Sequence, residues 1–131
     1  TFWSERIGIV AAIKTLKEMK RVKSWKTISE NGRLLKKEIA KIAKKNDFEI
    51  SFKGLDSLIS FEIQSQNTEL LHKFISYEML KVGFLAKNSI YVSTAHTKKI
   101  IKKYLFNLDL VFKKMKAKTF SEIKREIKKN L

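Results

Sequence analysis

The chain has 131 residues, 44% of them hydrophobic, which suits one domain with a core and not a disordered segment. It has no cysteine, which excludes disulfides, thiol catalysis and thiolate metal sites, and its two histidines, His72 and His96, lie too far apart to suggest an imidazole zinc site. Its formal net charge of +16 makes nucleic acid a candidate partner.

The kind of basic residue argues against that partner. Only four of the 29 basic residues are arginine, whose planar guanidinium is favoured for reading bases and clamping phosphates. The lysines are spread along every helical stretch, so we attribute the charge mainly to a solvated surface. A basic nucleic-acid-binding α/β module remains the alternative interpretation, although we consider nucleic acid an unlikely partner.

No apolar run approaches the roughly 20 residues that a membrane span needs, and no signal peptide opens the sequence. We therefore expect no membrane association and a cytoplasmic location. The chain begins at Thr1, without a methionine, and runs directly into apolar sequence. We interpret it as a fragment of a longer protein.

The first 45 residues are predicted to be helical. Apolar residues recur with a period of about 3.6 over residues 6–23 and again over residues 25–45. Ser24 lies between these stretches and is a plausible N-cap for the second helix. In the first helix the stripe consists of Ile9, Ala12, Ile13, Leu16 and Met19.

The apolar period then changes to two, which predicts strands at residues 48–52 and 58–64 around a turn at residues 54–57. In the second strand Ile59, Phe61 and Ile63 share one side, so one face of the unit is predicted to be buried. The aromatic residues fall on the same side as the aliphatic ones. A sheet that binds RNA would instead display its aromatics on an open face.

Three more helices are predicted in the second half. The first is capped by Asn67 or Thr68 and ends at Gly83, and a short strand pair at residues 84–86 and 89–92 follows it. Thr97 caps the next helix. A capping box, Thr119 with Glu122, starts a final helix. The predicted fold class is α+β, with helices packed on one face of a small, mainly antiparallel sheet.

Four segments, taken in order, resemble a known family. They are residues 1–8 (TFWSERIG), the alanine-containing helix at residues 11–19 (AAIKTLKEM), residues 78–85 (EMLKVGFL) and residues 91–97 (YVSTAHT). Their order and spacing are similar to those of the C-terminal small domain of class III, fold type I aminotransferases, in the glutamate-1-semialdehyde 2,1-aminomutase-like branch. The resemblance covers residues 1–116, and residues 117–131 would form an extra amphipathic tail helix.

The resemblance implies a pyridoxal 5′-phosphate (PLP) enzyme that transfers an amino group from a small-molecule donor to a carbonyl acceptor. The family's site lies between two domains and at a homodimer interface, and its cofactor-bearing lysine belongs to the large domain. No lysine of this chain occupies that position. The chain alone is therefore expected to be inactive, to need a missing large PLP-binding domain and to lack the cofactor.

One site residue is implied by the resemblance. The threonine at the position of Thr1 reaches the neighbouring subunit's site and hydrogen-bonds the cofactor phosphate. A hydroxyl and a backbone N–H can both donate to phosphate oxygens, and a nearby helix start adds a favourable positive end. The alternative is that Thr1 is a loop residue or a helix cap.

Other candidate residues have simpler interpretations. Phe2 and Trp3 could line the substrate entrance or be apolar surface, and Glu5 with Arg6 are expected to be first-turn helix residues. His96 is expected to bond backbone beside the Thr97 cap. His72 is expected to be a surface residue.

The sequence departs from many class III enzymes in one respect. Those enzymes carry a small-domain arginine that binds the substrate carboxylate, and residues 84–92 contain none. The aminomutase-like branch shares this lack, so the acceptor could be a semialdehyde, a keto acid or a keto sugar.

Overall fold

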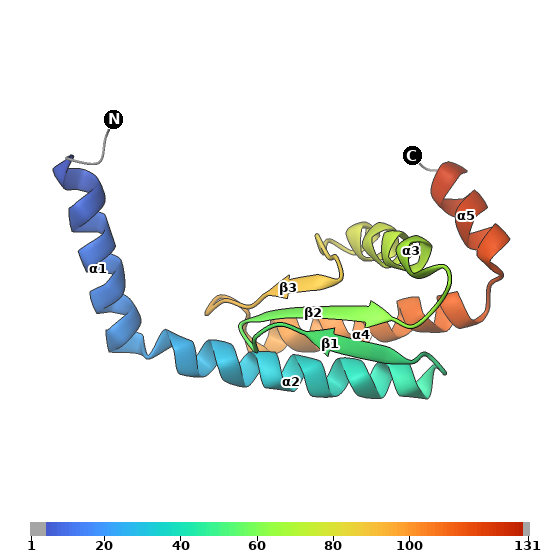
Figure 1. Ribbon diagram of the computed structural model, residues 1–131, viewed down its shortest axis with the longest axis horizontal. Helices are drawn as coiled ribbons and strands as arrows, with labels where there is room; N and C mark the ends of the chain where they lie inside the picture. Colours follow the sequence, from blue (N-terminus) through green and yellow to red (C-terminus); the bar gives the residue numbers. More distant parts are fainter. Residues whose placement is uncertain (1–4, 130–131) are drawn as a thin grey trace.

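The computed structural model describes residues 5–129 and shows a helical arm leading into an α+β body (Figure 1). Eight elements follow in chain order: α1 (Arg6–Val22), α2 (Ser24–Lys45), β1 (Ile50–Lys53), β2 (Leu58–Ile63), α3 (Thr68–Lys81), β3 (Ser89–Tyr91), α4 (Lys98–Lys116) and α5 (Phe120–Lys129). No helix among the described residues is long and apolar enough to cross a membrane.

The joint between α1 and α2 lies at Lys23, whose φ of 48° is left-handed. The prediction that Ser24 caps α2 is wrong, because Ser24 is the first residue of that helix and its buried hydroxyl has no hydrogen-bond partner. At this joint α1 turns steeply away from α2 and stands clear of the body (Figure 1).

The sheet has the order β1-β2-β3, and both pairings are antiparallel. Ile59, Phe61 and Ile63 are buried as predicted, and Phe52 lies directly opposite Phe61 on the covered side. The other side carries Leu58 and several polar residues over β1 and β2, and Lys53 pairs there with Glu62 at 2.9 Å. This arrangement confirms the predicted fold class.

The predicted strand at residues 84–86 is wrong, because these residues form an irregular loop. The Phe84 ring turns inward onto Tyr104, with ring centroids 5.6 Å apart, while Leu85 is 97% exposed. The Ala86 N–H bonds back to the Phe84 carbonyl at 2.9 Å, which closes a tight turn. Of the predicted strand pair only the second member is a strand, β3, and it pairs with β2.

The helix ends were predicted with mixed success. Thr97 caps α4 by accepting a hydrogen bond from the Ile100 N–H, and the capping box of Thr119 and Glu122 is present at α5. At α3, Asn67 occupies the N-cap position without a side-chain bond, and the Thr68 hydroxyl bonds the carbonyls that precede the helix. Neither residue therefore caps α3 as predicted.

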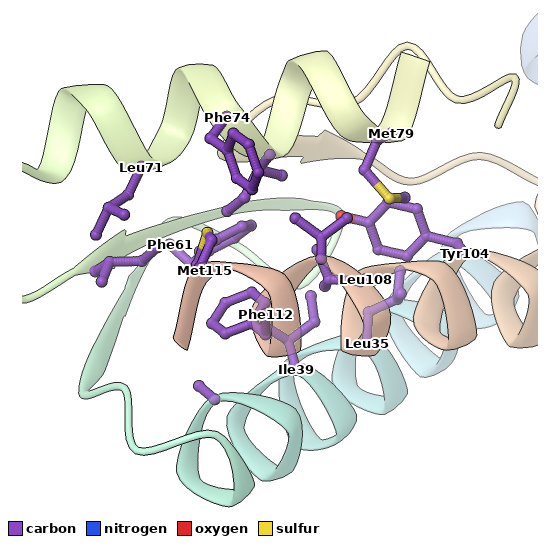
Figure 2. Packing of buried hydrophobic residues seen from close by; sticks show 14 of the residues in the cluster. Leu35, Ile39, Phe61, Leu71, Phe74, Met79, Tyr104, Leu108, Phe112 and Met115 are labelled. Atoms are coloured by element: carbon purple, nitrogen blue, oxygen red, sulfur yellow. The ribbon is translucent and has the colours of Figure 1, made fainter. Parts of the chain in front are cut away.

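The helices α2, α3, α4 and α5 share one core with the sheet. Figure 2 shows the part of this core that lies between α2, β2, α3 and α4. The Phe112 ring of α4 is fully buried and meets Phe48 edge-on at 5.3 Å. Glu78 of α3 is also buried, and Lys81 and Lys114 hydrogen-bond its two carboxylate oxygens, so an ion pair links α3 to α4. The residues of α5 that face this core are Ile123 and Ile127.

Candidate functional site

The implied phosphate ligand, Thr1, lies outside the described residues, and so do Phe2 and Trp3. Glu5 and Arg6 are described and exposed: Glu5 is the N-cap residue of α1, without a side-chain bond, and Arg6 opens the helix. The prediction of first-turn helix residues is confirmed for Arg6 and wrong for Glu5, whose backbone is extended just before the helix begins.

A hollow of about 250 Å³ lies between the loop that follows α3, strand β3 and the first half of α4. Its wall is mostly apolar and includes Phe84, Ile101 and Tyr104. The polar residues in its wall include Lys87, Ser89 and His96. A mostly apolar concave wall with a few polar groups is the usual form of a small-molecule site.

His96 is fixed in this wall by backbone contacts, as predicted. Its Nδ1 accepts a hydrogen bond from the Ser93 N–H at 2.9 Å, and its carbonyl accepts one from Asn31 of α2 at 3.0 Å. Because Nδ1 is an acceptor, the neutral ring carries its proton on Nε2. The ring can therefore offer one N–H donor to a neighbouring group.

Tyr104 contributes its ring to the same wall, but its hydroxyl is buried and has no hydrogen-bond partner. In Figure 2 this oxygen points into the core, toward Leu108 and Met79. Burial raises the pKa of the Tyr104 hydroxyl, since it disfavours the phenolate. Tyr104 is thus a packing residue in this chain and no acid or base.

His72 is not the surface residue that was predicted. Its ring is half-buried and meets Phe61 edge-on at 5.9 Å, and its Nε2 is buried without a partner. Burial lowers the pKa of His72, and the nearby Glu62 carboxylate opposes this shift. The ring therefore favours the neutral form and serves the core.

The hollow beside His96 does not fit PLP by itself. A PLP site needs a lysine amine for the aldehyde, donors for the phosphate and an acidic or basic partner for the ring nitrogen. The hollow offers one exposed lysine, Lys87, and neither an arginine nor a carboxylate. Residues 5–129 also contain no cluster that could hold a metal ion. This hollow alone therefore lacks the groups that would hold PLP.

No protein-family model matches the sequence, and no curated protein matches it. Among solved structures the chain is similar to the FumI protein of Sphingopyxis sp. MTA144, determined in its PLP internal aldimine form. The TM-score is 0.75 at 19% identity, and the match covers 85% of this chain and 27% of FumI. The chain therefore spans about a quarter of that protein and shares the fold of this part of FumI.

Proposed function

We propose that this chain is the small domain of a PLP-dependent class III aminotransferase or aminomutase of the glutamate-1-semialdehyde 2,1-aminomutase-like branch. The observation that carries the proposal is the fold shared with FumI over 85% of the chain. The four ordered sequence segments support the class and the branch. We call the longer protein that would contain both domains the parent.

In the parent, this domain would form one wall of the substrate cleft and part of the dimer contact. The bound cofactor supplies the carrier for the amino group, and the protein supplies binding and orientation. The hollow beside His96 is the best candidate for that wall, because it is concave and mostly apolar. Its lack of an arginine favours an acceptor that is not held by an arginine–carboxylate fork, such as a semialdehyde or a keto sugar.

Thr1 would hydrogen-bond the cofactor phosphate in the neighbouring subunit of a homodimer, through its hydroxyl and its backbone N–H. The chain alone would then be inactive, since the lysine that carries the cofactor belongs to the large domain. The domain proper would end near residue 116, and α5 would be an added tail helix packed on α3.

A visible absorption spectrum of the parent, purified with PLP, tests the proposal. We expect a yellow band that shifts when an amino donor such as glutamate is added, and no such band from this chain alone. Thr1→Val in the parent should weaken PLP retention, whereas Thr1→Ser keeps the hydroxyl and should retain the cofactor. A parent without the band that instead retains nucleic acid in a salt-sensitive way would favour the basic-module alternative.

A further inference from the structure

Helix α1 has an apolar face that nothing in residues 5–129 covers. None of its residues is buried, and it projects from the body as a separate arm (Figure 1). The apolar stripe recurs at helical spacing, and its four large side chains are 41–65% exposed. These four side chains are Ile9, Ile13, Leu16 and Met19.

The charges of α1 limit what can cover this stripe. The helix carries five basic residues and one acid, Glu18, which is already paired with Arg21. Lys17 lies beside the stripe, one turn after Ile13, and Lys20 lies at its C-terminal end, one turn after Leu16. A partner must therefore bring both an apolar groove and carboxylates at its rim.

A second copy of this chain does not meet that requirement. The formal net charge is +16, so two copies repel each other, and an α1–α1 contact would place like charges along both edges. The similarity to FumI suggests a different partner for the stripe of α1. This chain corresponds to 27% of FumI, so a PLP enzyme of this fold has a large remaining body that can cover an arm.

We propose that the stripe of α1 is a docking surface for the parent's cofactor-binding domain, which would receive it in an apolar groove rimmed by carboxylates. This inference rests on the proposed function, because it takes that domain as the partner.

Trypsin cleavage within α1 tests the inference in the intact parent. The arm offers Lys14, Lys17, Lys20 and Arg21 as cleavage sites. A lone helix of 17 residues is marginal in water, so we expect rapid cleavage in this chain and at least about ten-fold slower cleavage in the parent. Equal rates in the two proteins would overturn the inference.

Two matched pairs of variants in the parent locate the contact. Leu16→Glu and Ile7→Glu each lower the charge by one and remove no cleavage site, but only Leu16 lies in the stripe, so only Leu16→Glu should restore rapid cleavage. Lys20→Glu and Lys14→Glu each reverse one charge and remove one cleavage site. Only Lys20→Glu, which changes a charge next to the stripe, should restore rapid cleavage. The same cleavage rate within either pair would contradict an apolar groove with an acidic rim.

The absorption spectrum of the same samples separates this inference from the proposed function. A parent with the PLP band but an unprotected arm would overturn the docking inference alone, and a parent without the band would overturn the proposed function. Two results with this chain alone would also overturn the inference: a dimer that Leu16→Glu dissociates, or flotation with anionic lipid vesicles that Leu16→Glu abolishes.

Discussion

Helices α1 and α4 are similar in length, with 17 and 19 residues, and both have an apolar stripe flanked by lysines. In the described chain α4 buries six residues and α1 buries none. The same kind of sequence pattern therefore accompanies a core helix in one case and an exposed arm in the other. An amphipathic pattern shows that a helix needs an apolar neighbour, but it does not show where that neighbour is.

The largest expected effect comes from making one substitution in both helices. Leu108 of α4 is fully buried, whereas Leu16 of α1 is 65% exposed. Leu108→Ala should lower the free energy of unfolding by about 3–5 kcal/mol, because it leaves a cavity in the core. Leu16→Ala should change it by less than about 0.5 kcal/mol. Urea denaturation of this chain measures both values, and similar losses would mean that α1 packs on the body.

Replacing a glycine by alanine should have opposite effects on stability in the body and in the α1 arm. A Cβ on Gly32 of α2 would lie 1.7 Å from the Asp56 carbonyl oxygen, whereas a Cβ on Gly8 of α1 would meet nothing within 4 Å. Gly32→Ala should therefore destabilise the body by about 1–3 kcal/mol, despite the better helix propensity of alanine. Gly8→Ala should leave the body unchanged and favour the α1 helix by about 1 kcal/mol.

Urea denaturation reports the effect of Gly32→Ala, and far-UV circular dichroism reports the helix content added by Gly8→Ala. A Gly32→Ala variant as stable as the original would mean that the turn between β1 and β2 does not press on α2.

The ion pairs of the two regions also differ. Burial alone would raise the pKa of Glu78, but hydrogen bonds from Lys114 and Lys81 lower it below its usual value. A lowered folded-state pKa stabilises the fold above the unfolded-state pKa of about 4.3, and this stabilisation is lost as the pH falls through the folded-state value. Glu78→Gln should cost about 1–3 kcal/mol at neutral pH, with a smaller loss at acid pH.

Glu18 is the matched control, since its ion pair with Arg21 lies on the exposed arm. Hydrogen bonding from Arg21 lowers the pKa of Glu18 too, but solvent screens that pair. Glu18→Gln should leave the denaturation midpoint of the body unchanged at every pH. Equal pH profiles for the Glu78→Gln variant and the original chain would contradict the role given to the buried pair.

Much of the body could be predicted from the sequence because its signals are local. The alternation of Ile59, Phe61 and Ile63 places one strand face in the core, and Thr119 with Glu122 marks the start of α5 by side-chain chemistry alone. The failures concern features set by tertiary neighbours. Residues 84–86 are apolar like a strand but pack as a loop, and His72 is covered because β2 passes beneath α3.

The prediction of an N-cap at the joint between α1 and α2 was wrong for a different reason. A serine near a helix start predicts an N-cap, yet the chain turns one residue earlier, at a lysine in the left-handed region that usually holds glycine or asparagine. For the candidate site, the sequence predicted the backbone contacts of His96 but not the hollow beside it, which needs β3 and α4 to be placed together. The assignment of Thr1 as a phosphate ligand stays a prediction.

Amide hydrogen exchange of this chain in solution tests the difference between arm and body most directly. The amides of α4 around Leu108 and Phe112 should exchange slowly, because they open only when the body unfolds. The amides of α1 should exchange nearly as fast as those of an unstructured peptide, because a lone helix of this length frays and no core holds it. Protection of α1 equal to that of α4 in the monomeric chain would contradict the account, since the arm would then be part of the folded body.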